Sequence, residues 1–526
     1  MKASKLIFIV AICGILFGCT PQKEESNHVK NVIILIADGA SIDLLTLSRW
    51  FNDNQPLALD PYLCGLIRTH NADGKFPDSA PTSTAYATGV KSITPYIGID
   101  SNAEPRVSVL ELAKRKGLAT GVVATSEFTH ATPADFVCHF NSREGHHYKN
   151  LAKQFIYNSP NLVFAGGEYY LETHNYHHLL EPSNISLIND KKSFENLNTL
   201  SDKHQWVLFP DWKNSKKNMS YECDRIADKA PSLSEMTDKA IQLLSQNKNG
   251  FFLMVEGSQI DWAVHNNDPY SAVTEFMEFN KAVEVALKFA KTNKNTVVII
   301  CADHATGGLS MGNSSSGEGY IVKNVTKYDN IDIKENIIEP LRKVKWSSRK
   351  LAGMMLENAD YISKDSLKKY YNTEATTEFL KKLKQVSTLK NVDTLQFLIG
   401  ENFSRKNFIG WTTTGHTAED VFLAIYTPEG VQRMTGVIDN HEIGKYIAKV
   451  LKLDDFDAVT KEYFTKHTSF FTEDEIISLC SDSLVVMDKG KKIVFESNSN
   501  LIIVDGVAKQ QPSINICING VYYINW

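Results

Sequence analysis

The sequence contains no internal repeat, no long low-complexity tract and no Cys-x-x-Cys pair. Without closely spaced cysteines, a zinc site built on thiolates is not expected. The eight cysteines permit disulfides in an oxidising compartment, but their scatter favours separate buried thiols. Basic residues are not in excess either, because 56 Lys and Arg stand against 61 Asp and Glu. The composition therefore gives no reason to expect nucleic-acid binding, which usually needs a basic face.

The N-terminus carries a targeting segment. Lys2 and Lys5 precede an apolar run, residues 6–17, that is too short to span a bilayer comfortably. The run ends in Leu16-Phe17-Gly18-Cys19, which resembles a bacterial lipoprotein cleavage site. This resemblance implies a signal peptide over 1–18, a lipidated Cys19, a polar tether over 19–29 and a place in the cell envelope. The anchor would sit in the periplasm or outer membrane, facing inward or outward. An ordinary signal peptide or an uncleaved anchor is the alternative.

Short apolar runs alternate with helical patterns along most of the chain. Six runs have the length and composition of strands buried on both faces: residues 32–37, 121–124, 162–165, 251–255, 297–302 and 421–426. Helical spacing of apolar residues is found over 107–115, 233–245 and 272–290. This alternation predicts an α/β fold with a central, mostly parallel sheet sandwiched by helices.

Two regions fall outside this pattern. Residues 310–411 form a long, charged segment with helical character, and we expect a helical insertion there. From residue 483 onward the chain is rich in β-branched runs punctuated by Asn and Gly, which predicts a small β-rich module. The expected organisation is a catalytic domain over 30–455, interrupted by the insertion, and a C-terminal extension over 456–526.

Ionisable residues cluster at the predicted strand ends. Asp38, Glu256 and the pair Asp303-His304 each follow an apolar run, and ligands of open α/β sheets bind at that edge. Taken singly, such a residue could equally cap a turn or a helix. Asp261 and His265 stand at i and i+4, so a helix would place both on one face. His416 lies in a small-residue loop and alone would be read as an ordinary loop residue.

A run of small and hydroxyl side chains, residues 77–89, surrounds one serine preceded by an acid, Asp78-Ser79. So little bulk suggests a helix start that gives close access to backbone and hydroxyl groups. A helix N-terminus there would direct N–H groups and the helix dipole toward an anion. His nitrogens and carboxylate oxygens suit zinc, whereas hydroxyl and carboxylate oxygens suit magnesium. Ser79 is therefore a candidate nucleophile beside metal ions.

Five motifs between about residues 31 and 450 resemble those of the alkaline phosphatase family, both in their order along the chain and in their residues. The resemblance implies hydrolysis of phosphate monoesters by a homodimer, through a serine, Ser79, that becomes phosphorylated. It also implies two zinc ions and one magnesium ion per subunit. The ligands would be Asp261, His265 and His416 for one zinc, Asp38, Asp303 and His304 for the second, and Asp38, Thr132 and Glu256 for magnesium.

Arg143 follows the motif His130-Ala131-Thr132-Pro133 at the family's spacing and would clamp the phosphoryl oxygens. Two positions beside the magnesium and phosphate depart from a common pattern. His130 stands where some members have Asp, and Trp262 stands where others have Lys or His. Because imidazole prefers softer ions, His130 could turn the third site toward a transition metal.

Rival functions are a phosphodiesterase or a sulfatase of the same superfamily. Ser79-Ala80-Pro81 begins like a sulfatase motif, but Ser83 stands where that motif needs Arg. An arginine on the free phosphate oxygens argues against a diesterase, which needs room for a second ester group. A rival of another class is a surface binding lipoprotein on a retired enzyme scaffold, although every expected metal position is filled.

Overall fold

The computed structural model describes residues 29–312 and 332–526. The predicted signal peptide, residues 1–18, and the predicted lipidation site Cys19 lie outside the described residues, as does the tether up to residue 28. Within the described ranges, the search for a helix with the length and apolarity needed to cross a membrane found none.

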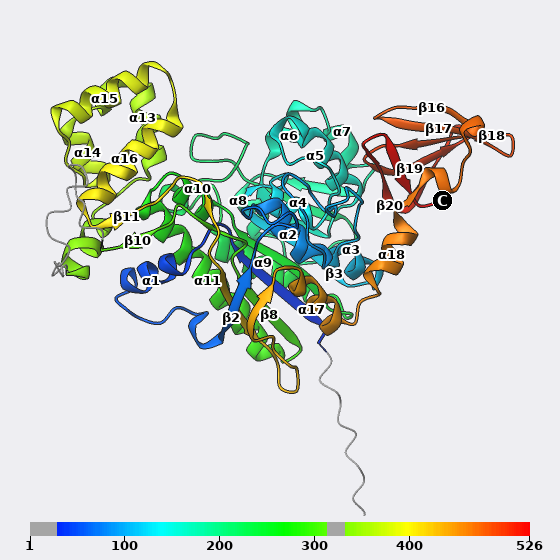
Figure 1. Cartoon of the computed structure of the whole chain (residues 1–526), viewed down its shortest axis with the longest axis horizontal. Helices are drawn as coiled ribbons and strands as arrows, with labels where there is room; N and C mark the ends of the chain where they lie inside the picture. Colours follow the sequence, from blue (N-terminus) through cyan, green and yellow to red (C-terminus); the bar gives the residue numbers. More distant parts are fainter. Residues whose placement is uncertain (1–28, 313–331) are drawn as a thin grey trace, which may run out of the picture.

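A ten-stranded sheet forms the centre of the molecule (Figure 1). The strand order is β14-β2-β13-β8-β1-β7-β3-β4-β6-β5. Every neighbouring pair is parallel except the two that β13 makes, with β8 and with β2. The strands are β1 (Asn31–Ala37), β2 (Leu63–Arg68), β3 (Ala119–Glu127), β4 (Leu162–Gly166), β5 (Ile185–Ile188), β6 (His204–Leu208), β7 (Phe251–Gly257), β8 (Thr296–Cys301), β13 (Val421–Tyr426) and β14 (Gly436–Asp439).

The predicted mostly parallel sheet is confirmed, and all six predicted strands belong to it. The sequence analysis did not identify four further strands, β2, β5, β6 and β14. These four occupy the two ends of the sheet, where β2, β5 and β14 keep exposed or half-exposed positions and β6 opens with His204 and Gln205. A strand that is covered incompletely does not need a continuous apolar run, so the pattern used for central strands misses it.

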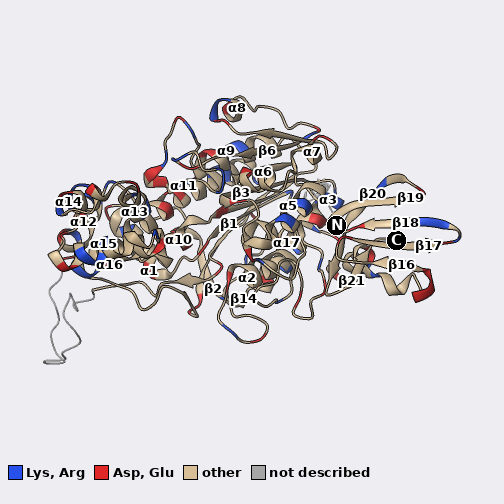
Figure 2. Cartoon of the chain, turned by 90° about the horizontal axis from the view of Figure 1, so that it is seen from above, with Lys and Arg blue, Asp and Glu red and all other residues tan. Residues whose placement is uncertain are grey.

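Helices cover both faces of the sheet, as Figure 2 shows from above. One layer packs α9 (Leu233–Leu244) and α1 (Ile42–Phe51) around the long helix α11 (Pro269–Asn293). The opposite layer joins α2 (Ser79–Thr88), α3 (Val109–Arg115), α4 (Ala131–Asp135) and α17 (His441–Leu451). α3 starts two residues later than predicted, because Ser108 is the N-cap and forms a capping box with Glu111.

Helix α2 is fixed against the sheet and its neighbours by polar contacts as well as packing. All ten of its residues are buried, and Gly89 ends it in a left-handed conformation. The Tyr86 hydroxyl donates to the carbonyl of Ala302, 2.7 Å away, at the end of β8. The Thr84 hydroxyl donates to Asp135 on α4 at 2.7 Å. The first residue of α2, Ser79, is therefore held in a defined position over the edge of the sheet.

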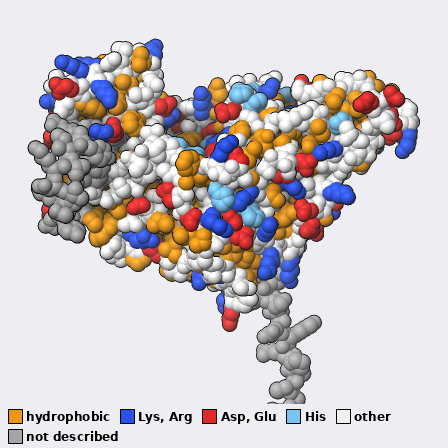
Figure 3. All heavy atoms as spheres, viewed as in Figure 1, with side chains coloured by type: hydrophobic (Ala, Val, Ile, Leu, Met, Phe, Trp, Pro, Cys, Tyr) orange, Lys and Arg blue, Asp and Glu red, His pale blue; other side chains and the backbone are white. Residues whose placement is uncertain are grey.

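The insertion and the C-terminal module lie at opposite ends of the molecule's long axis (Figures 1 and 3). The short strands β10 (Ser310–Met311) and β11 (Ile409–Gly410) pair and bracket the insertion. Its described part is helical, as predicted: π-helix 334–338, α12 (Glu339–Arg342), α13 (Ser348–Glu357), α14 (Lys364–Tyr371), α15 (Thr377–Thr388) and α16 (Val392–Lys406).

The C-terminal module, residues 456–526, begins with α18 (Phe456–Tyr463) and continues as a seven-stranded antiparallel sheet. The predicted β-rich character is confirmed. The strands are β15 (Thr465–Lys466), β16 (Ile476–Leu479), β17 (Ser483–Asp488), β18 (Lys491–Glu496), β19 (Ser499–Val504), β20 (Val507–Ile518) and β21 (Val521–Ile524).

The contact between α2 and α17 predicts a site of low tolerance. A Cβ atom on Gly444 would lie 2.7 Å from the amide nitrogen of Gly89 and 2.8 Å from the Tyr86 carbonyl oxygen. Gly444→Ala should therefore lower the free energy of unfolding in urea by about 1–3 kcal/mol, the usual cost of overpacking. Gly145→Ala is the control, since a Cβ atom there meets nothing within 4 Å. Equal stability of the two variants would contradict this close approach.

Candidate active site

Acidic residues and histidines from the sheet and one helix meet at the carboxyl edge of the sheet. Asp38 follows β1, Asp303 and His304 follow β8, and Glu256 is the penultimate residue of β7. Because β7, β1 and β8 are adjacent and parallel, their ends bring these side chains together. All four are fully buried. The sheet topology alone thus concentrates three carboxylates in one buried volume.

Helix α10 (Gln259–His265) adds Asp261 and His265 from one face, as the i, i+4 spacing predicts. The Nε2 atom of His265 lies 3.2 Å from Asp261 Oδ2. A close backbone approach fixes α10, because a Cβ atom on Gly39 would lie 2.5 Å from Asp261 Oδ1. Gly39 also adopts a φ of +73°, which favours glycine.

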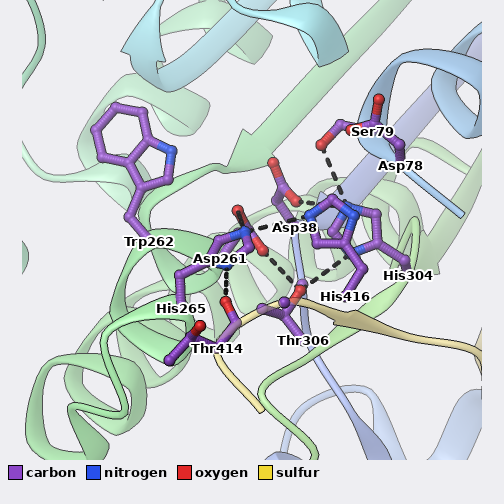
Figure 4. Close-up of polar contacts among 12 residues, drawn as sticks. Asp38, Asp78, Ser79, Asp261, Trp262, His265, His304, Thr306, Thr414 and His416 are labelled. Carbon is purple, nitrogen blue, oxygen red and sulfur yellow. Dashed lines mark hydrogen bonds and ion pairs between the residues drawn. The ribbon is translucent and has the colours of Figure 1, made fainter. Parts of the chain in front are cut away.

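His416 reaches the cluster through a short β bridge. The sequence placed it in a loop, but it opens the two-residue strand β12 (His416–Thr417), which pairs with β9 (Ala305–Thr306). The His416 ring stacks on that of His304 with a centroid distance of 3.9 Å. Its Nε2 atom lies 3.2 Å from Nε2 of His265 (Figure 4).

The three histidines are oriented by acceptors on their Nδ1 sides. His265 Nδ1 faces the carbonyl oxygen of Thr414, and His416 Nδ1 faces that of Pro77 at 2.9 Å. Carbonyl oxygens only accept, so both Nδ1 atoms must carry the proton. Thr306 donates to Asp261 at 2.7 Å, so its oxygen accepts from His304 Nδ1 at 3.2 Å.

In the neutral imidazoles the Nε2 atoms then carry lone pairs that point into the cluster. His304 Nε2 lies 3.3 Å from Asp303 Oδ2, 3.5 Å from Asp38 Oδ1 and 3.2 Å from the Ser79 hydroxyl. A lone pair facing carboxylate oxygens is repulsive unless a cation lies between them. The orientation of the rings is therefore that of metal-binding histidines.

Among the described residues, Asp38, Glu256 and Asp303 have no cationic ion-pair partner, whereas Asp261 pairs with His265, which is positively charged at pH 7. In the described part of the chain, the ion-pair partners of Asp38, Glu256, Asp261 and Asp303 are all histidines. Burial and the nearby His416 lower the pKa of His304 well below its usual value, so this ring is neutral at pH 7. Burial and Arg143 lower the pKa of His130 to about 3. Burial lowers the pKa of His265, but Asp261 outweighs it and the value rises to about 9.

The carboxylic acids respond to this shortage of positive charge. Burial, followed by the Asp303 carboxylate, raises the pKa of Asp38 well above its usual value. Burial raises the pKa of Glu256 to about 7, and burial with Asp261 raises the pKa of Asp303 to about 6. Burial also acts on Asp261 by raising its pKa, but the positively charged His265 outweighs burial and lowers the pKa. Such shifts mark a site that attracts cations.

Unpaired buried atoms mark where cations fit. Among the described residues, several buried polar atoms at this site have no hydrogen-bond partner: both oxygens of Asp38 and of Glu256, Asp303 Oδ2, Thr132 Oγ1 and His130 Nδ1. Three groups bring ligand atoms within 4.8 Å of one another. They are Asp261 with His304 and His416, Asp38 with Asp303 and His304, and Asp38 with His130 and Glu256. These donors suit divalent metal ions.

A second set of side chains borders Ser79. Arg143 pairs through Nη1 with Asp78, the N-cap residue of α2, and its Nη2 atom lies 3.2 Å from His130 Nε2. Burial raises the pKa of Asp78, but Arg143 outweighs it and the pKa falls. The Trp262 ring meets the His130 ring edge to face, 5.8 Å between centroids, and lies apart from the hydrogen-bonded cluster (Figure 4).

The structure thus brings all the predicted ligands and the predicted nucleophile to one site. Sequence analysis missed the residues that orient them: Asp78, Thr306 and the carbonyl groups of Pro77 and Thr414. Adjacency to His304 or His416 was the only available signal for Thr306 and Thr414.

Several known proteins are similar to this chain in sequence or in fold. Residues 29–453 match the alkaline phosphatase family. Alkaline phosphatase 3 of Bacillus subtilis is 34% identical over 481 residues, which cover 85% of this chain and 97% of that protein. The repressible alkaline phosphatase of Saccharomyces cerevisiae is 30% identical, with 91% and 92% covered. The crystal structure of the cold-active alkaline phosphatase from Shewanella sp. has a TM-score of 0.68 at 27% identity, covering 80% of this chain and 99% of that one.

The family match spans the strands, α2 and α10 that build the site, and it includes every predicted ligand. A buried serine at a helix start, beside carboxylates and histidines arranged to bind divalent metals, is the chemistry such an enzyme needs. The chain therefore belongs to the alkaline phosphatase family and is a phosphomonoesterase hydrolase.

Proposed function

We propose that this enzyme hydrolyses phosphate monoesters through a phosphoserine at Ser79, with two zinc ions and a third divalent ion held around it. One observation carries the proposal. The Nε2 atom of His304 faces the Ser79 hydroxyl and two carboxylates, and its Nδ1 atom is occupied by Thr306. Cations bound between these atoms would remove the repulsion between the Nε2 lone pair and the carboxylate oxygens.

The proposed zinc ligands overlap two of the groups described above, with His265 in place of His304 in the first group. Asp261, His265 and His416 would hold one zinc ion, and Asp38, Asp303 and His304 the second. His304 lies within ligand distance of both groups. When bound, two zinc ions stabilise the attacking and leaving oxygens of an in-line displacement and lower the pKa of the serine hydroxyl.

The third site would use Asp38, Thr132 and Glu256, whose buried oxygens lack hydrogen-bond partners among the described residues. His130 belongs to the same site, because its Nδ1 atom is buried, unpartnered and 3.9 Å from Glu256 Oε1. Hydroxyl and carboxylate oxygens favour magnesium, whereas the imidazole favours a softer ion. We propose magnesium here, with a transition metal as the competitor that His130 admits.

Ser79 is placed to attack phosphorus. It is the first residue of α2, so the free N–H groups of the first turn and the helix dipole favour the phosphate anion. Its hydroxyl proton must leave during attack and is balanced by the proton that the departing alcohol takes up. Cations held by the neighbouring ligands would lower the pKa of the hydroxyl. Transfer forms the Ser79 Oγ–phosphorus bond and breaks the ester bond, releasing the alcohol. Water then cleaves the phosphoserine and inorganic phosphate leaves.

Arg143 would hold two non-bridging phosphate oxygens with its planar guanidinium group. Its pairing with Asp78 and His130 Nε2 orients that group beside Ser79. An arginine bound to two of the three non-bridging oxygens favours monoesters over diesters, because a diester carries less negative charge and needs room for a second ester group. His130 and Trp262 would border the bound phosphate, with Trp262 placed where a cationic residue would otherwise contact it.

We also propose that the enzyme is a homodimer and is attached to the cell envelope through a lipidated Cys19. Family resemblance supports the first statement, and the sequence Leu16-Phe17-Gly18-Cys19 supports the second. Mass spectrometry of the N-terminal peptide from native membranes tests the anchor. An acylated Cys19 is expected, and an unmodified peptide that begins elsewhere would contradict it.

The role of Ser79 predicts the effect of removing its hydroxyl. Ser79→Ala should lower kcat/KM for an aryl phosphate monoester by about 10³-fold or more. Ser83→Ala is the matched control, because Ser83 lies on the same helix, is equally buried and makes no hydrogen bond to a described residue. Acid-quenched wild-type enzyme should yield a phosphopeptide containing Ser79. Unchanged activity of Ser79→Ala would remove Ser79 as the nucleophile.

The buried carboxylates predict that metal loss costs stability as well as activity. Dialysis against a chelator should abolish hydrolysis and lower Tm by several degrees, because Asp38, Glu256 and Asp303 then face one another without cations. Addition of zinc and magnesium should restore both properties. Asp38→Asn should bind less metal per chain and lose less Tm on chelation. Full activity after chelation, with no metal detected by elemental analysis, would contradict the proposal.

A further inference from the structure

The C-terminal module lies beyond the family match, which ends at residue 453. The module packs against the catalytic domain. It contacts residues 139–143, the segment that ends in Arg143, which we call the arginine segment. Three of the contacts between the described residues link the module to the arginine segment: one runs through a buried glutamine, one through an aromatic ring and one through an asparagine side chain.

The first contact fixes the backbone where the arginine segment begins. Gln154, on α5 (Tyr148–Tyr157), is fully buried, and its Oε1 atom accepts from the His139 amide at 2.7 Å. Its Nε2 atom donates to the His139 carbonyl at 3.0 Å and to Asn498 Oδ1 at 2.8 Å. Asn498 belongs to the turn between β18 and β19. The module therefore completes the hydrogen bonding of the amide that holds His139.

The same turn and the last residue of β18 also bind α5 directly. Lys153 Nζ pairs with Glu496 at 2.6 Å and donates to the carbonyl oxygen of Ser497 at 3.1 Å. Asn498 Nδ2 also donates to Asn150 at 3.3 Å. Because Gln154 lies on α5, these bonds keep the helix and the turn in register. The position of Gln154 is thus set from the module side.

The second and third contacts reach the arginine segment itself. The ring of Phe464, 5% exposed, lies 4.7 Å from the ring of His139. His139 is fully buried, and its nitrogens bond to the Gly98 carbonyl and to Glu111. Farther along, Asn141 Nδ2 donates to Asn519 in the turn between β20 and β21 at 3.0 Å. Asn141 is only two residues before Arg143.

We infer that the C-terminal module positions Arg143 for phosphate binding by holding the arginine segment at His139 and Asn141. The inference rests on the proposed function, in which Arg143 clamps phosphate. The side chain of Arg143 is partly exposed, and its bonds to Asp78 and His130 leave its backbone to be fixed elsewhere. Phe140 pairs with Ile97 of the catalytic domain through two backbone hydrogen bonds, and the module adds the contacts to His139 and Asn141 on either side of it. Phe464 and Asn498 are therefore positioning residues that never touch substrate.

The test compares full-length, metal-loaded enzymes with inorganic phosphate as the probe. Phe464→Leu keeps most of the buried volume. Asn498→Gly removes the Oδ1 acceptor and suits the backbone φ of +59°. The combined variant should raise the inhibition constant of phosphate and the KM of a monoester by about threefold to tenfold, with kcat changed less than about twofold. Phe471→Leu is the matched control, since Phe471 is also 5% exposed but packs within the module on Phe495 and Trp526.

A double-mutant cycle with Arg143→Ala decides whether the effect passes through Arg143. In the Arg143→Ala background, the module substitutions should cause no further loss of phosphate affinity. Additive losses, or an equal loss in Phe471→Leu at matched Tm, would overturn the positioning role, as would wild-type affinity in the combined variant. If Arg143→Ala itself leaves phosphate affinity unchanged, the proposed clamp fails and the positioning role falls with it.

Discussion

The structure of the active site depends on carboxylates that are buried without positively charged protein groups to neutralise them. Asp38, Glu256 and Asp303 are fully buried, yet the described residues that pair with them are histidines, of which His304 and His130 are neutral at pH 7. Burying unpaired charge is costly, so such an arrangement persists because a cation offsets it. The fold and the chemistry are thus two consequences of one requirement, that positive ions fill the carboxyl edge of the sheet.

The architecture serves that requirement at several levels. Parallel pairing of β7, β1 and β8 brings the carboxylates together, and α10 adds Asp261 and His265 from one helical face. The bond from Tyr86 to the Ala302 carbonyl fixes α2 next to Asp303, so the Ser79 hydroxyl reaches His304. The proposed nucleophile and the proposed metal ligands therefore depend on the same strand end. Small displacements of α2 are expected to affect catalysis before they affect the fold.

The sequence predicted the central sheet because strands buried on both faces leave continuous apolar runs. It indicated Asp38, Glu256 and Asp303 because an ionisable residue after such a run is conspicuous, and His265 because of its spacing from Asp261. The local pattern around His416 did not mark it, and only the family resemblance did, because its position depends on the pairing of β12 with β9. The carbonyl oxygens of Pro77 and Thr414 were not predicted at all. Backbone acceptors have no side-chain signature. The contact of Asn498 with Gln154 was equally invisible, because polar pairs distant in sequence leave no local pattern.

The most direct test is anomalous X-ray diffraction above the zinc edge on crystals of metal-loaded protein with bound phosphate. The account predicts two strong peaks about 3.5–4 Å apart. One should lie against Asp261, His265 and His416, the other against Asp38, Asp303 and His304, with phosphate between the metals, Ser79 and Arg143. Crystals with no anomalous peak at these residues, from protein that hydrolyses monoesters at full rate, would contradict it.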